Sequence, residues 1–306
     1  MTTHSFSGPW TLIKLDLLGR YLKFFNTALQ GQPRPASPFD RIYIDAFAGT
    51  GQCEIKLTDG TRSTINGSAK IAAHTDPAFH QIHLVDLKKK HVAELKILGA
   101  SGSTSEIHVH KDDANSALEA IISKVNWRRT RGVLFLDPYG MAVRWETLQT
   151  IAKTEALDVW YLFPLSAVYR QAAKDFDKVD EGKAAKLDAV LGTPDWRNVF
   201  YEKSSQDCLL PDDVQSARRT AGPPEIATYI HSRLSEIFQG WVSPPIFLPE
   251  VGPPMFALFF AVANPSEAAV KLSKRAAEHL FGMLRNKKIG QITRTVAPDE
   301  LQPDLF

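Results

Sequence analysis

The chain has 306 residues, of which 44% are hydrophobic and 23% charged, and its formal net charge is +2. These values are ordinary for a soluble globular protein, and the length is enough for a substantial core. The sequence contains no internal repeat and no low-complexity tract, and its charge neither requires nor excludes nucleic acid as a partner.

Cysteines, histidines and apolar runs bear on location and metal binding. The two cysteines, Cys53 and Cys208, give neither a disulfide framework nor a zinc-ligand pattern, which suits a reducing cytoplasm. Nine histidines lack matching cysteine or carboxylate spacing, so no metal site is expected. The sequence has no apolar signal core and no apolar run long enough to span a bilayer, and no membrane association is expected.

Apolar periodicity predicts helices alternating with strands. A helix covers 10–29, where leucines recur at helical spacing, and a proline-rich break follows. Polar residues at 52–66 predict a surface loop. The pattern then predicts strands at 42–46, 81–86, 106–110, 132–140 and 157–163, with helices at 68–74 and 89–98 and a further one ending at 125. This alternation predicts an α/β fold with a doubly wound, mostly parallel, Rossmann-like sheet.

The strand pattern lapses at 165–240, which predicts a helical insertion that acts as a lid or a docking surface. Strands return at 246–248 and 255–262, where Pro253 and Pro254 permit a hairpin-like pair at a sheet edge. A helix at 266–284 closes the fold. We therefore expect a Rossmann-like domain at 1–164 and 241–290, the insertion at 165–240, and a loosely ordered tail at 291–306.

The most informative segment runs from Ile42 to Gly51, with the sequence Ile-Tyr-Ile-Asp-Ala-Phe-Ala-Gly-Thr-Gly. An apolar strand leads to Asp45, and a turn with Gly49 and Gly51 follows. Glycines allow close approach of a ligand, and a carboxylate beside them would repel a phosphate but favour a sulfonium, an ammonium or a ribose hydroxyl. The pattern favours S-adenosylmethionine over a dinucleotide, although a strand–helix turn without a ligand fits this segment alone equally well.

Acidic residues recur at the carboxyl ends of the predicted strands: Asp45, Asp86 and Asp137, with Asp113 shortly after the third strand. A single aspartate there is most often a helix cap, but four at equivalent positions converge on one edge of a parallel sheet. Asp86 is the candidate acceptor for both ribose hydroxyls. Asp113, with Asp112 as the alternative, is the candidate acceptor for the adenine amino group. Asp86 and Asp113 both remain candidate helix caps.

The segment Asp137-Pro138-Tyr139-Gly140 is the second motif. An aspartate with a nearby carbonyl can accept hydrogen bonds from an amino group and align its lone pair, while a tyrosine stacks on a planar base. Transfer to an exocyclic amine depends mainly on such positioning. A proline-bounded turn with a packed tyrosine is the structural alternative.

These motifs resemble the three-Cys-motif partner protein family, which is similar to class I S-adenosylmethionine-dependent methyltransferases. The resemblance runs from about Trp10 to Asn264 and is carried by Ile44–Gly51, Gly67–Ala69, Asp113–Asn115, Phe135–Gly140, Trp145, Leu162–Pro164 and Arg170, with the opening Trp10–Leu15. It implies that Asp45, Phe47, Gly49, Gly51, Asp86 and Asp113 surround the cofactor and that Asp137, Pro138 and Tyr139 meet the acceptor. It also implies a partner with three clustered cysteines that resembles radical S-adenosylmethionine, iron–sulfur enzymes.

The acceptor motif departs from adenine amino-methyltransferases, which usually have two prolines before the aromatic residue, and is closer to enzymes that dimethylate a guanine amino group in transfer RNA. The function expected is methylation of an amino nitrogen of an RNA or DNA base. The alternative is an inactive subunit that holds S-adenosylmethionine for the iron–sulfur partner. An NAD-dependent enzyme is disfavoured because the first turn lacks a full Gly-x-Gly-x-x-Gly.

Overall fold

The computed structural model describes residues 4–5, 9–34, 37–56, 62–203, 217–249 and 252–286. The expected tail at 291–306 lies outside the described residues. The chain forms two compact units, each assembled from separate segments. Unit 1 comprises residues 1–113, 126–135 and 267–306, and unit 2 comprises 114–125 and 136–266.

Parallel strands form the centre of unit 1, in the order β9-β4-β7-β8. They are β4 (Asp40–Asp45), β7 (Gln81–Val85), β8 (Glu106–His110) and β9 (Thr130–Leu136). Every residue of β4 after Asp40 is buried, as expected for an apolar strand covered on both faces. Asp45 stands opposite Leu84 on one side and Phe135 on the other, at the carboxyl ends of the strands.

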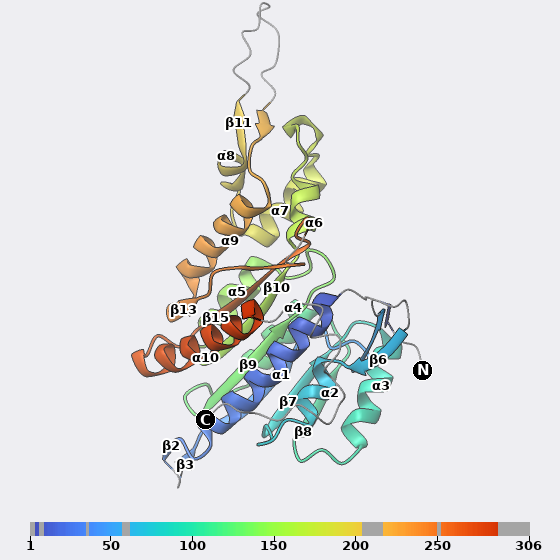
Figure 1. The fold of residues 1–306 in the computed structure, drawn as a ribbon, viewed down its shortest axis with the longest axis vertical. Coiled ribbons are helices and arrows are strands. Elements are labelled where there is room, and N and C mark those ends of the chain that lie inside the picture. Colours follow the sequence, from blue (N-terminus) through green and yellow to red (C-terminus); the bar gives the residue numbers. More distant parts are fainter. Residues whose placement is uncertain are drawn as a thin grey trace, which may run out of the picture. The chain divides into compact units, whose positions relative to one another are not determined.

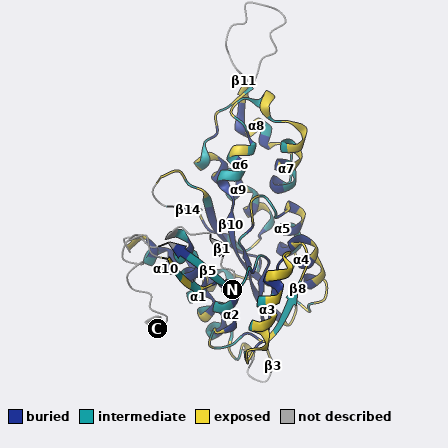
Figure 2. Ribbon diagram, turned by 90° about the vertical axis from the view of Figure 1, so that its right-hand side faces the viewer, coloured by how far each residue is buried: buried dark blue, intermediate teal, exposed yellow. Residues whose placement is uncertain are grey.

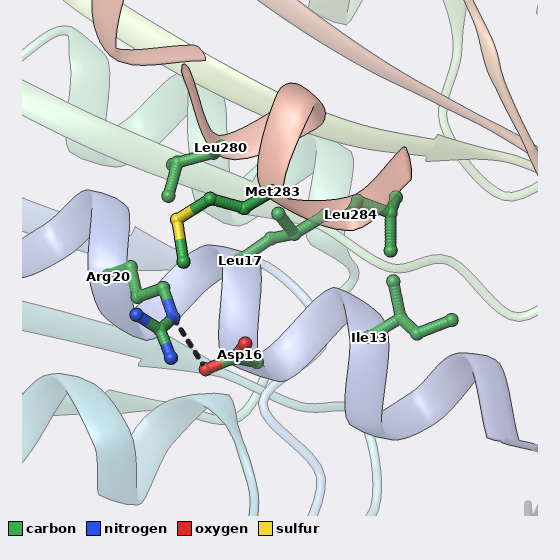
Figure 3. Close-up of a pocket in the computed structure, with 7 residues that line it drawn as sticks. All are labelled: Ile13, Asp16, Leu17, Arg20, Leu280, Met283 and Leu284. Carbon is green, nitrogen blue, oxygen red and sulfur yellow. Dashed lines mark hydrogen bonds and ion pairs between the residues drawn. The ribbon is translucent and has the colours of Figure 1, made fainter. Parts of the chain in front are cut away.

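The helices of unit 1 are α1 (Pro9–Leu29), α2 (Ser68–Ala73), α3 (Lys89–Ala100) and α10 (Glu267–Asn286). The two longest, α1 and α10, pack side by side although they lie at opposite ends of the chain (Figure 1). Leucines and Ile13 line their contact, while Arg20 Nε donates to Asp16 Oδ1 at 2.9 Å beside it (Figure 3). The cavity between them is about 20 Å³, room for about one water, so this contact is structural.

A small sheet replaces the surface loop that we expected at 52–66. Strand β5 (Gln52–Lys56) pairs antiparallel with β6 (Arg62–Asn66), and β1 (His4–Ser5) lies parallel to β5. The side chains of these strands alternate between the two faces of the sheet, with Ile55 buried and Ile65 half-buried. Because the outward side chains are polar, the segment resembles a loop in the sequence. Another short pair, β2 (Pro33–Arg34) with β3 (Ser37–Pro38), occupies the proline-rich break.

Three histidines gather on one face of β7 and β8. The ring of His83 stacks on His108 and His110, with centroids 4.8 and 5.4 Å apart, and its Nδ1 lies 3.1 Å from His110 Nε2. Burial lowers the pKa of His83 to about 3, and the neighbouring charges of His108 and His110 act in the same direction. His83 is therefore neutral at physiological pH.

Unit 2 contains the antiparallel part of the fold. Strands β13 (Trp241–Val242), β14 (Ile246–Leu248) and β10 (Leu157–Phe163) all pair antiparallel with β15 (Phe256–Val262). The β14–β15 pairing confirms the predicted hairpin-like pair. All of β10 and all but the first residue of β15 are buried, as the dark ribbon of Figure 2 shows for β10.

The helices of unit 2 are α4 (Ala114–Ile122), α5 (Trp145–Ala152), α6 (Leu165–Gln171), α7 (Glu181–Leu191), α8 (Trp196–Phe200) and α9 (Pro223–Ile237), with a 3-10 turn, η1, at Phe176–Lys178. The expected insertion is helical but also holds an antiparallel pair, β11 (Tyr201–Lys203) with β12 (Ala217–Arg219). Fully buried Trp196 and Phe200 form its local core. Arg219 N donates to Lys174 O at 2.7 Å, so the two ends of the segment 175–218 lie next to each other.

The chain is thus a mixed α/β protein with a mostly parallel, eight-stranded central sheet and flanking helices, which confirms the predicted Rossmann-like fold class. The predicted domain limits at 164 and 240 differ from the limits of the two compact units. That division stays a prediction. None of the described helices is both long enough and apolar enough to cross a membrane.

Candidate functional site

The turn after β4 points its backbone donors inward. Its N–H groups bond to the ends of neighbouring strands, to buried carboxylates or within the turn. The bonds are Ala46 N to Phe135 O (3.2 Å), Phe47 N to Asp45 Oδ1 (3.2 Å), Ala48 N to Val85 O (2.9 Å), Gly49 N to Asp86 Oδ2 (3.1 Å) and Gly51 N to Ala48 O (3.4 Å). These donors are consequently not available to a phosphate, unlike those of a phosphate-binding loop.

Both predicted glycines adopt left-handed backbone conformations, with φ of +62° at Gly49 and +76° at Gly51. Such angles disfavour any residue with a Cβ. A Cβ built on Gly49 would lie within 4 Å of no described atom, so the space beside that residue is open to a ligand as far as the described chain is concerned. Gly67, by contrast, is needed for packing, because its Cβ would lie 3.1 Å from the carbonyl carbon of Gly51.

Asp45 is fully buried beneath the turn. Its Oδ2 accepts from the Tyr43 hydroxyl at 3.2 Å, and its Oδ1 accepts from Phe47 N at the same distance. The Asp45 carboxylate therefore fixes the turn at the carboxyl end of β4. Phe47 lies half-buried in this turn. In this position Asp45 supports the turn from below and presents no surface to solvent.

Asp86 follows β7 and is 6% exposed. Its Oδ2 accepts from Gly49 N at 3.1 Å and lies 2.9 Å from His91 Nδ1, while Oδ1 accepts from Lys88 N at 2.8 Å. The carboxylate thus joins the glycine turn to the start of α3. A carboxylate has about four acceptor directions, so within the described part of the chain one remains, on Oδ1.

Asp113 lies three residues beyond β8 and is exposed, as is Asp112. Asp112 Oδ1 accepts from Asp113 N at 2.8 Å, which shapes the loop that leads into α4. This hydrogen bond also fixes the orientation of the Asp112 side chain.

The acceptor motif follows β9 in unit 2. Asp137 is half-buried, Pro138 is buried, and Tyr139 is 46% exposed, which is unusual for so large an aromatic side chain. Gly140 ends the motif with φ of +63°. The turn therefore directs the tyrosine ring outward from a fixed backbone.

Asn115 is a residue whose role the sequence did not reveal. It is 6% exposed, its Oδ1 accepts from Arg144 N (3.0 Å) and Thr147 Oγ1 (2.8 Å), and its Nδ2 donates to Ala142 O (2.9 Å). These bonds fasten the loop that follows the acceptor motif to α4 and α5. The sequence could have indicated this role, because a polar residue on the buried face of an amphipathic helix needs hydrogen-bond partners.

The structure therefore brings most of the cofactor candidates together in unit 1. Asp45, Phe47, Gly49 and Asp86 are linked by hydrogen bonds within and around a single turn, with Gly51 at its end. Asp113 follows a neighbouring strand of the same unit. Asp137, Pro138 and Tyr139 belong to unit 2.

No protein-family model and no curated protein matches the sequence. Among solved structures, a Legionella pneumophila protein of family DUF519 aligns with 91% of this chain and 94% of its own, at 14% identity and a TM-score of 0.47. A likeness at this level carries no argument about function.

Proposed function

We propose that the chain is an S-adenosylmethionine-dependent methyltransferase that modifies an exocyclic amino nitrogen of an RNA or DNA base. We further propose that it belongs to the three-Cys-motif partner family and works with the radical S-adenosylmethionine-like, iron–sulfur protein of that family. The alternative is an inactive subunit that binds S-adenosylmethionine for this partner.

The observation that supports the proposal is the direction of the backbone donors in the turn after β4. Phe47 N and Gly49 N donate to the carboxylates of Asp45 and Asp86. A dinucleotide site at this position would present such donors to a pyrophosphate. A turn that holds two carboxylates instead suits a ligand that brings hydroxyl donors and positive charge.

The described residues fit such a ligand at three points. Asp86 Oδ1 has one acceptor direction left for a ribose hydroxyl, Gly49 faces open space, and Asp113 is an exposed acceptor after the adjacent strand. The bound cofactor would supply a methyl group on a sulfonium. Asp45 favours that positive charge through the turn without touching the ligand.

Asp137 and Tyr139 have the chemistry required at an acceptor amine. The carboxylate would accept a hydrogen bond from the amino group and orient its lone pair, and the exposed ring would stack on the base. A base in a duplex would have to leave the helix to reach them, so single-stranded, looped or damaged nucleic acid is the expected substrate.

Calorimetry with S-adenosylmethionine and S-adenosylhomocysteine tests the cofactor proposal. Asp86→Ala should weaken binding more than tenfold, because a hydroxyl that loses a charged acceptor costs about 1.5–3 kcal/mol. Glu278→Ala, which removes an exposed carboxylate on α10, is the matched control and should bind like the wild type. Melting temperatures of both variants separate lost binding from lost fold. Tight NAD binding with no response to either adenosyl ligand would contradict the proposal.

A further inference from the structure

His91 lies in the first turn of α3 and belongs to none of the sequence motifs. The side chains of His91 and Asp86 are each 5% exposed, and His91 Nδ1 lies 2.9 Å from Asp86 Oδ2. An ionised carboxylate only accepts hydrogen bonds, so in this contact Nδ1 carries the proton and donates. His91 therefore bonds directly to the candidate ribose acceptor.

The three donors to Asp86 differ in kind. Gly49 and Lys88 donate through their backbone, and their positions are set by the turn after β4 and by the start of α3. His91 donates through a side chain. Substitution at position 91 can therefore remove one bond to the carboxylate and leave both backbone bonds in place.

The arrangement also limits what Asp86 can accept. Oδ2 has two donors, Gly49 N and His91 Nδ1, which fill its acceptor directions, whereas Oδ1 has one donor, Lys88 N. The bond from His91 thereby decides which oxygen remains open. A ribose offers two hydroxyls, whereas the one acceptor direction left on Oδ1 can take one of them.

We propose that His91 is a positioning residue that holds the Asp86 carboxylate so that Oδ1 accepts one ribose hydroxyl, and not both, of a bound adenosyl ligand. This inference rests on the proposed function. It adds a residue to the site and a specificity to it: of the two ribose hydroxyls, one is recognised by Asp86 and the other is not.

Calorimetric titration with S-adenosylhomocysteine and its 2′-deoxy and 3′-deoxy forms tests this. The wild type should bind one deoxy form at least about tenfold more weakly than the intact ligand, and the other nearly as well. His91→Phe keeps an aromatic ring but loses the donor. It should weaken binding of the intact ligand about tenfold and leave binding of the sensitive deoxy form unchanged. His91→Asn, whose amide nitrogen can take the place of Nδ1, should recover most of the affinity.

Three other outcomes would each overturn the inference. Equal loss for intact and deoxy ligands in His91→Phe would mean that His91 only supports the fold, and equal sensitivity to both deoxy forms would mean that Asp86 binds both hydroxyls. Either result overturns the inference while the proposed function stands. If the wild type binds none of the three ligands, the proposed function fails and this inference with it. Should His91→Phe not fold, His91→Leu also has no side-chain donor and is judged by the same comparison.

Discussion

In the proposed function, Asp137 and Tyr139 distinguish a transferase from a subunit that only holds the cofactor. Asp137→Ala should lower turnover at least about a hundredfold with little change in cofactor affinity, because the amine loses the group that orients it. Asp137→Asn should retain part of the activity, since its amide oxygen still accepts one hydrogen bond. Tyr139→Phe should be mild because stacking survives, and Tyr139→Ala severe.

The assay for these variants is transfer of labelled methyl from S-adenosylmethionine to total cellular RNA and DNA, with and without the proposed iron–sulfur partner. Cofactor binding is measured in parallel. A protein that binds the cofactor yet labels no fraction under either condition would support the inactive subunit instead.

Gly49 offers a test of the turn that does not depend on any ligand. Gly49→Ala should destabilise the protein by about 1–2 kcal/mol, because φ of +62° is strained for a residue with a Cβ. Gly282 in α10 is the matched control, since a Cβ there also meets no described atom within 4 Å. Gly282→Ala should stabilise by about 0.5–1 kcal/mol, as in other helix interiors. Urea unfolding measures both changes. The prediction is contradicted if the two substitutions change the free energy of unfolding in the same direction.

Among the secondary-structure elements, the histidine face of β7 and β8 predicts a pH dependence of stability. The pKa of His83 falls from 6.5 to about 3 in the fold, so the unfolded chain binds the proton more readily. Stability from this group is therefore fully present above pH 6.5 and is lost as the pH falls towards 3. Between pH 7 and pH 5 the loss should be about 2 kcal/mol from this residue.

His83→Leu, which cannot titrate, provides the comparison. Its free energy of unfolding should fall less steeply between pH 7 and pH 5 than that of the wild type, and carboxylates common to both proteins cancel in the difference. Parallel curves would show that His83 accepts a proton in the folded state.

The sequence predicted elements best where one periodicity dominates a segment. The strands at 106–110, 157–163 and 246–248 have the predicted limits. Apolar runs end at a proline in the last two, and an alternating segment ends before Lys111 in the first. It missed β5 and β6, whose outward side chains are polar. At the site it singled out Asp86 and Gly49. It did not single out His91 and gave Asn115 no role, because these roles depend on contacts between segments that a linear pattern does not contain.

For the whole molecule, the helical segment of unit 2 can be tested by excision. Because Lys174 O accepts from Arg219 N at 2.7 Å, residues 175–218 can be replaced by a short glycine linker. We expect cofactor affinity to stay within about twofold, since the cofactor candidates lie in unit 1, while methyl transfer or partner association is lost. This tests the role of the segment as a lid or docking surface.

The control for this excision replaces only residues 204–216, and it keeps the paired strands β11 and β12. It should retain more transfer than the larger excision. If the larger excision abolishes cofactor binding or unfolds the protein, the segment is structural and the lid or docking role is wrong.

The pairing of α1 with α10 has a consequence for synthesis on the ribosome. The apolar face of α1, including Ile13 and Leu17, packs against Leu280 and Leu284 of a helix that begins only at Glu267. At about 5–20 residues per second, α1 emerges roughly 10–50 s before its cover exists. Throughout that interval the nascent chain presents an apolar helix face that only a chaperone or a transient contact can cover, and any product that terminates before Glu267 keeps it uncovered.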